Sequence, residues 1–79
     1  MKARVIVTLK PGVLDPQGKA IEGALRSLGV AGVASVRQGK SFDIELDADS
    51  REAAGRKLSE ACEKLLANMI VEDYTVEYE

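Results

Sequence analysis

The sequence has no histidine, no tryptophan and a single cysteine among its 79 residues. Without histidine, neither a Ser-His nor a Cys-His catalytic pair can form. One cysteine cannot make an internal disulfide, and it cannot complete a zinc site without further Cys or His ligands. Cys62 falls within an apolar helical pattern, so we expect a small core residue rather than a reactive thiolate. This cysteine usage is typical of a reducing cytosol.

Long hydrophobic runs are also lacking. No window approaches the ~18 apolar residues of a membrane span, and the N-terminal stretch MKARVIVTLKPG is too short and interrupted for a signal peptide. We therefore expect a soluble, cytoplasmic protein without membrane contact, forming one domain over residues 1–79. A chain of this size buries only roughly 60 to 65% of its unfolded surface, so association would add to its modest stability.

The net charge of −2 provides no basic field for nucleic-acid binding. Residues 1–40 carry a balance of +5 and residues 41–79 a balance of −7, and we expect these charges to pair within one sheet. An RNA-binding sheet would expose aromatic residues for base stacking. The three aromatic residues are core-facing or ambiguous by alternation, which argues against that function: Phe42, Tyr74 and Tyr78.

The stretch LKPGVLDPQGKA, residues 9–20, lies where a phosphate-binding loop would be found. Its glycines have the wrong spacing, Ala20 follows Lys19 in place of Ser or Thr, and Asp15 puts a carboxylate into the anion site. An acylphosphatase-like loop would need an arginine that is absent here. Instead, Asp15 is typical of a helix N-cap and Pro16 of the first helical position.

Hydrophobic periodicity predicts four strands and two helices. Paired carboxylates such as Asp47 with Asp49, or Glu72 with Asp73, have no second catalytic element and indicate a solvated surface. The second helix should bury Leu58, Ala61, Cys62, Leu65 and Leu66. The predicted elements are a strand over Lys2–Lys10, a helix from Pro16 to Leu28, an extended segment over Val30–Gln38, a hairpin turn at Gly39-Lys40, a strand over residues 41–47, a helix capped by Asp49 and Glu52 that ends near Asn68, and a last strand starting after Glu72.

The order strand, helix, strand, strand, helix, strand predicts an α+β, ferredoxin-like βαββαβ fold, with a four-stranded antiparallel sheet and both helices on one face. The first and third strands would be neighbours, placing Lys2 and Arg4 beside Asp43, Glu45 and Asp47 as cross-strand ion pairs. From these patterns two functions remain open. One is an interaction subunit, and the other is a free-standing regulatory domain that binds a small molecule.

Four segments, in order and at these spacings, carry a resemblance along almost the whole chain: LKPGVLDPQG, AIEGALRSLG, VASVRQGK and CEKLLANMIVEDY. The sequence resembles the PurS subunit family of phosphoribosylformylglycinamidine synthase. That family commonly has Val-Ile-Glu where this chain has Ile70-Val71-Glu72, a swap that conserves volume.

The resemblance implies a non-catalytic subunit of a purine-biosynthetic ligase, with no active-site, cofactor-binding or metal-binding residues of its own. A large synthetase subunit of the PurL type would use ATP and Mg²⁺, and a glutaminase subunit of the PurQ type would release ammonia. A homodimer of this chain, or a tetramer, would bridge the two and help to enclose the ammonia path. Two exposed loops are expected to contact the partners, through Lys10, Pro11, Gly12, Val13, Leu14, Asp15, Pro16, Gln17, Arg37, Gly39 and Lys40.

Overall fold

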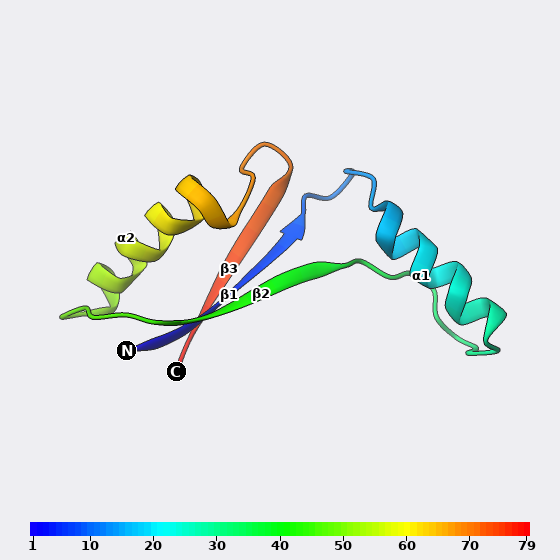
Figure 1. Ribbon diagram of the computed structural model, residues 1–79, viewed down its shortest axis with the longest axis horizontal. Helices are drawn as coiled ribbons and strands as arrows, with labels where there is room; N and C mark the ends of the chain where they lie inside the picture. Colours follow the sequence, from blue (N-terminus) through cyan, green and yellow to red (C-terminus); the bar gives the residue numbers. More distant parts are fainter.

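A computed structural model describes residues 1–79 and shows two helices and a three-stranded antiparallel sheet (Figure 1). No helix is long and apolar enough to cross a membrane. The elements in chain order are β1 (Lys2–Leu9), α1 (Pro16–Ser27), β2 (Gly39–Glu45), α2 (Arg51–Ala61), a π-helical turn (Cys62–Leu66) and β3 (Glu72–Tyr78).

Strand β1 lies at the centre of the sheet, with β2 and β3 on either side. The alternation seen in the sequence is confirmed, because Ala3, Val5 and Val7 are buried on one face. Helix α2 covers this face, and Leu58 and Cys62 complete the small core. Only 10 of the 79 residues are buried, which leaves much of the apolar surface of the isolated chain open to solvent.

The opposite face of the sheet carries the predicted cross-strand ion pairs. Arg4 Nε lies 2.8 Å from Asp43 Oδ1, and Lys2 Nζ lies 3.5 Å from Glu45 Oε1. Both pairs join β1 to β2, and because they are exposed each adds little stability. They join charges from the two halves of the chain, as does the pair between Lys10 Nζ and Asp73 Oδ1 at 2.9 Å.

The region from α1 to the start of β2 departs from the predicted fold. Helix α1 and the segment that returns from it form an arm, residues 16–38, which stands away from the sheet (Figure 1). The chain measures 50 × 26 × 15 Å and has a radius of gyration of 15.8 Å, whereas a compact chain of this length would have roughly 12 Å. The prediction that both helices cover one face is therefore wrong for this chain, and α2 covers it alone.

The predicted second strand over Val30–Gln38 is not formed, so the sheet of the chain has three strands and not four. The predicted hairpin at Gly39-Lys40 is also absent. Gly39 and Lys40 instead pair with Thr8 and Val7 in the β1–β2 ladder, so the chain runs straight into β2. The local Gly-Lys pattern suits a turn, but ladder hydrogen bonds to β1 hold it extended.

Three details of the helix and strand ends also differ from expectation. The N-cap of α2 is Ser50, whose Oγ accepts a hydrogen bond from Ala53 N at 3.1 Å, and not Asp49. Leu65 was expected in the core but is 83% exposed, because the π-helical turn widens the end of the helix and carries it outward. Strand β3 begins at Glu72, one residue earlier than predicted.

Candidate functional site

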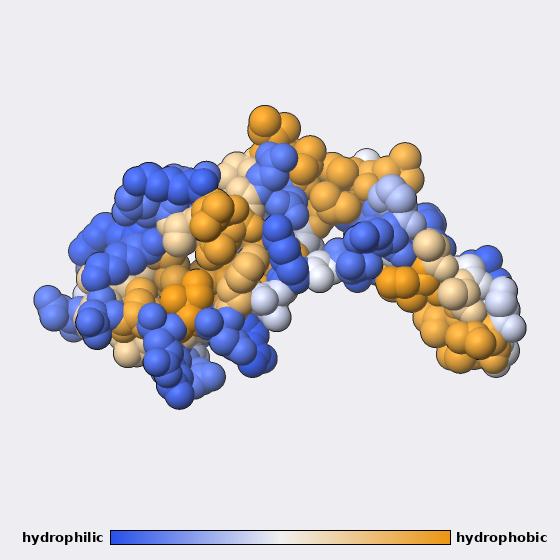
Figure 2. Space-filling view, viewed as in Figure 1, coloured by the Kyte–Doolittle hydropathy of each residue, from blue (hydrophilic) through white to orange (hydrophobic).

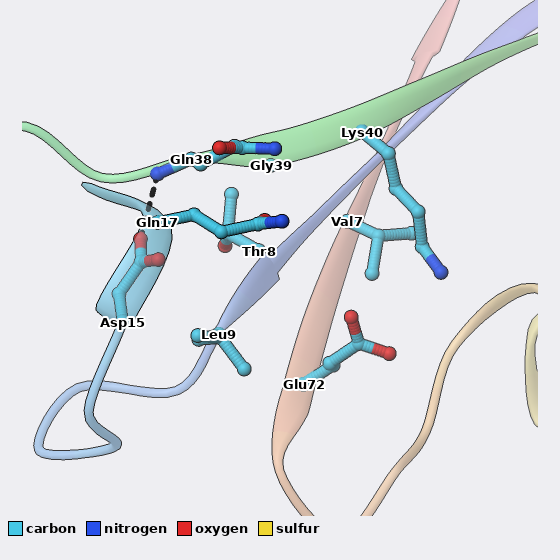
Figure 3. Close-up of a pocket in the computed structure, with 9 residues that line it drawn as sticks. All are labelled: Val7, Thr8, Leu9, Asp15, Gln17, Gln38, Gly39, Lys40 and Glu72. Carbon is cyan, nitrogen blue, oxygen red and sulfur yellow. Dashed lines mark hydrogen bonds between the residues drawn. The ribbon is translucent and has the colours of Figure 1, made fainter. Parts of the chain in front are cut away.

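Asp15 links the start of α1 to the segment that returns from it. Its Oδ1 accepts a hydrogen bond from Gly18 N at 2.9 Å, as expected of an N-cap. Its Oδ2 accepts a second hydrogen bond, from Gln38 N at 2.7 Å (Figure 3). These two donors hold the pKa of Asp15 below its usual range. The N-cap prediction is confirmed, and the structure adds a bond to a residue 23 positions away.

Arg37 ties the same returning segment to the end of β1. Its Nη2 donates to Leu9 O at 3.1 Å and to Lys10 O at 3.2 Å, and its Nη1 donates to Val13 O at 3.4 Å. The planar guanidinium is suited to this task, because it directs several donors in fixed directions. The predicted loops 10–17 and 37–40 are therefore brought together, largely through this side chain.

Glu22 completes the connection from the middle of α1. It is 6% exposed, and its Oε2 accepts a hydrogen bond from Val36 N at 3.1 Å. Lys19 and Arg26 lie at 3.7 and 4.0 Å from its Oε1 and balance its charge. We call Asp15, Glu22 and Arg37 the clasp, because each side chain bonds backbone groups of another segment.

Sequence reasoning missed Glu22, although a signal was present. Asp15, Gly18 and Glu22 are spaced i, i+3 and i+7, so they share one face of α1. A glycine between two carboxylates on one helix face leaves room for another chain segment. A Cβ at Gly18 would collide with Val36 O and would lie 2.7 Å from Asp15 Oδ2.

A shallow cleft of about 230 Å³ lies beside the clasp (Figure 3). Gln17 and Gln38 lie side by side at one end, and Lys40 and Glu72 project into it from β2 and β3. Four of its nine lining residues were predicted as interface residues: Asp15, Gln17, Gly39 and Lys40. The charged side chains of its lining are Asp15, Lys40 and Glu72.

Two features outside the cleft concern metal binding and thiol chemistry. No group of three or more His, Cys, Asp or Glu side chains could hold a metal ion. Cys62 is fully buried, and burial raises the pKa of its thiol. The expectation that Cys62 is a core residue is confirmed, and its protonated thiol is a poor nucleophile.

Large exposed apolar side chains gather in two places. The first is the arm face, which comprises Ile21, Leu28, Val30 and Val33, and Figure 2 shows apolar surface over the far end of the arm. The second is the crest, which comprises Leu14 in the β1–α1 loop, Leu65 in the π-helical turn, and Met69 and Ile70 in the loop before β3. Unpartnered apolar patches on so small a protein are typical of association surfaces.

The crest is held rigidly. Asn68 O accepts hydrogen bonds from Val71 N at 3.0 Å and Glu72 N at 2.7 Å, and Asn68 N donates to Glu72 Oε1 at 2.6 Å. Lys10 N donates to Val71 O at 2.8 Å, which joins this turn to the β1–α1 loop. Ile70, 85% exposed, therefore projects from a turn whose backbone is hydrogen-bonded, and Leu14, 77% exposed, lies in the loop that Lys10 N joins to this turn. Among the predicted interface residues, Leu14 is fully available, whereas Asp15 is buried.

Comparison with known proteins assigns the family. The sequence model of PurS, phosphoribosylformylglycinamidine (FGAM) synthase, matches residues 2–79. The PurS subunit of phosphoribosylformylglycinamidine synthase from Archaeoglobus fulgidus is 47% identical over 76 residues, covering 96% of this chain and 95% of that protein. The corresponding subunit from Bacillus subtilis is 44% identical over 78 residues, covering 99% and 92%.

Solved structures agree with the sequence match. The crystal structure of Methanocaldococcus jannaschii PurS, one of the subunits of formylglycinamide ribonucleotide amidotransferase, superposes with a TM-score of 0.90 at 41% identity, covering 99% of this chain and 94% of that one. A chain in the structure of PurLQS from Thermotoga maritima superposes with a TM-score of 0.89 at 38% identity, covering 96% and 93%. Both sequence and fold therefore show that the chain belongs to the PurS family of phosphoribosylformylglycinamidine synthase subunits.

Proposed function

We propose that this chain is a small non-catalytic subunit of a cytoplasmic phosphoribosylformylglycinamidine synthase, where it bridges a PurL-type synthetase and a PurQ-type glutaminase. In that assembly ATP and Mg²⁺ are used by the synthetase, and ammonia passes to it from the glutaminase. The bridging subunit contributes by excluding water from the ammonia path, since ammonia released into water would be protonated and lost. The observation that carries the proposal is the chain's family together with its two unpartnered apolar surfaces.

The two surfaces suit two kinds of contact. The arm face lies on the part of the chain that has left its own sheet, and the outer edge of β2 is unpaired. We propose that two copies form a homodimer in which the arm of each covers the sheet of the other. Residues 30–38 of the second copy would then take the fourth strand position beside β2, which completes the predicted four-stranded sheet.

We propose that the crest and the adjoining β1–α1 loop contact the larger subunits. Leu14 and Ile70 project from ordered backbone, so little conformational entropy is lost when a partner covers them. The predicted contact loops over residues 10–17 and 37–40 adjoin the crest, because Lys10 N bonds Val71 O and Arg37 bonds Lys10 O. We therefore place the synthetase and glutaminase contacts at this end of the sheet.

Two matched substitutions separate the two surfaces. Leu14→Asp places a charge on the crest and Leu28→Asp places one on the arm face, and both side chains are more than three quarters exposed in the isolated chain, at 77% and 78%. We expect Leu28→Asp to abolish self-association, measured by sedimentation. We expect Leu14→Asp to remain a dimer but to lose co-elution with the synthetase and glutaminase, and glutamine-dependent turnover.

The wild-type protein serves as the reference, mixed with both larger subunits in the presence of nucleotide and glutamine. Failure of the wild type to co-elute, together with saturable binding of a small metabolite by the isolated protein, would support a free-standing regulatory domain. Normal assembly and turnover by Leu14→Asp would show that the crest is not a partner contact.

A further inference from the structure

The closed fold predicted from the sequence and the open fold of this structure are two arrangements that would cover the same apolar surfaces. In the closed arrangement, α1 would fold onto its own sheet and residues 30–38 would reverse at Gly39-Lys40 to pair with their own β2. In the open arrangement, seen here, the arm points away and is free to cover a second copy. Exchange of α1 and residues 30–38 between two chains differs from closure within one chain only at the hinge, Gly39-Lys40. The conformation of this hinge therefore decides between the two arrangements.

The clasp contains hydrogen bonds that only the open arrangement can make. With Gly39 and Lys40 paired to Thr8 and Val7, the preceding residue Gln38 stays beside the end of β1, where its N–H reaches Asp15. A reversal at Gly39-Lys40 would put residues 30–38 on the outer side of β2. That position is two strand spacings from β1, roughly 10 Å.

Arg37 makes the same distinction more sharply. Its three hydrogen bonds go to carbonyl oxygens of Leu9, Lys10 and Val13, all at or just after the end of β1. From the outer side of β2, the guanidinium would have to reach across a whole strand to make them. Closure would therefore leave the guanidinium without these acceptors and would also break the ladder pairing of Gly39 and Lys40.

Gly39 adds a steric argument. A Cβ at this position would lie 2.7 Å from Val7 O and 2.9 Å from Thr8 Cγ2, so the close approach of β1 and β2 here requires glycine. Its backbone has no positive φ angle, unlike Gly12, Gly29 and Gly32. The glycine therefore serves strand packing in the open chain and not a tight turn.

We propose that the clasp is a conformational lock, in which Asp15 and Arg37 hold the arm open and thereby commit the chain to exchange with a second copy instead of closing on itself. The proposal rests on the self-association that we have proposed above. Since the dimer requires two open chains, any increase in the population of the closed form weakens dimerisation.

Two variants test the lock with different risks to folding. Asp15→Asn retains one acceptor oxygen, which can still cap Gly18 N but cannot also accept from Gln38 N. Arg37→Ala removes an exposed side chain and all three of its hydrogen bonds. Arg56→Ala, at an exposed position of α2 outside the clasp, is the matched control.

The first measurement is the dimer dissociation constant by sedimentation equilibrium. We expect this dissociation constant to increase at least about tenfold for both clasp variants, because that is the effect of losing one hydrogen bond to a charged group. For Arg56→Ala we expect it to be unchanged. The second is the intrachain distance between spin labels at Ser27→Cys and Glu45→Cys in a Cys62→Ala background, with labelled chains diluted into unlabelled ones. Ser27 is the last residue of α1, in the arm, and Glu45 is the last residue of β2, in the sheet from which the arm stands away (Figure 1).

The wild type should show one long intrachain distance, and the clasp variants should add a short one from the closed form. Circular dichroism confirms that the variants are folded. Unchanged dimerisation and a single long distance in both folded variants would overturn the proposal. A wild type that is monomeric but still shows only the long distance would refute the proposed dimer and leave the lock supported, so the two failures are distinguishable.

Discussion

Gly18 and Gly23 both lie in α1, yet replacing each with alanine should have opposite effects on stability. Alanine in a helix usually stabilises by about 0.4–1 kcal/mol, because it restricts the unfolded chain and has the higher helix propensity. A Cβ at Gly23 would meet nothing within 4 Å, so Gly23→Ala should show this gain in full. A Cβ at Gly18 would collide with Val36 O, which is a backbone atom of the returning segment.

The collision at Gly18 outweighs the gain in propensity. Forcing an extra methyl group against a packed backbone costs about 1–3 kcal/mol. If residues 36–38 move away instead, the hydrogen bonds from Val36 N to Glu22 and from Gln38 N to Asp15 are strained or lost, and hydrogen bonds to charged groups contribute about 1.5–3 kcal/mol each. We therefore expect Gly18→Ala to lie at least about 1.5 kcal/mol below Gly23→Ala in unfolding free energy.

Urea unfolding followed by circular dichroism measures this difference. All proteins should be compared at one protein concentration, since self-association would shift the apparent stability. Equal m-values would show that the variants unfold by the same transition. If Gly18→Ala proved as stable as Gly23→Ala, the close approach of residues 36–38 to α1, and with it the clasp, would be refuted.

Two further predictions concern the core and the decrease in unfolding free energy at low pH. Leu58→Ala should cost about 2–5 kcal/mol of unfolding free energy because Leu58 is 2% exposed, whereas Leu65→Ala, at 83% exposure, should change it by less than about 0.5 kcal/mol; equal losses in thermal unfolding would contradict the placement of the π-helical turn. The folded pKa of Asp15 lies below its unfolded value, so its carboxylate stabilises the fold above the unfolded pKa and the stabilisation is lost as pH falls through the folded pKa. Asp15→Asn should therefore lose less unfolding free energy than the wild type as the pH falls below about 4, measured by urea titrations. The same decrease in both proteins would contradict this.

Much of the local structure followed from the sequence because its causes lie within a few residues. Alternation placed Val5 and Val7 in the core, and Pro16 after Asp15 placed the start of α1. The ion pair between Arg4 and Asp43 followed once β1 and β2 were taken as neighbours. Of the candidate site, the two loops could be named, but the bonds that join them could not.

Those bonds depend on which segments meet in space. Asp15 was predicted as a helix cap, a role that neighbouring residues explain, whereas its bond to Gln38 N depends on where the returning segment runs. Glu22 is ordinary by position in a helix, and its burial is decided by Val36. Leu65 fits a buried stripe at α-helical spacing, but a π-helical turn carries its side chain outward. The spacing of apolar residues in the sequence does not reveal such a turn.

The sequence by itself determined the two helices, the three strands that form, the N-cap of α1, the family and the sign of each charged strand face, since these depend on local pattern and composition. Only the tertiary structure decided that the arm stands open. Gly39 and Lys40 are locally compatible with a turn or with a strand, and hydrogen bonds to β1 select the strand. The physical reason is that a hinge has nearly the same local energy in both arrangements, so contacts between residues far apart in the chain choose between them.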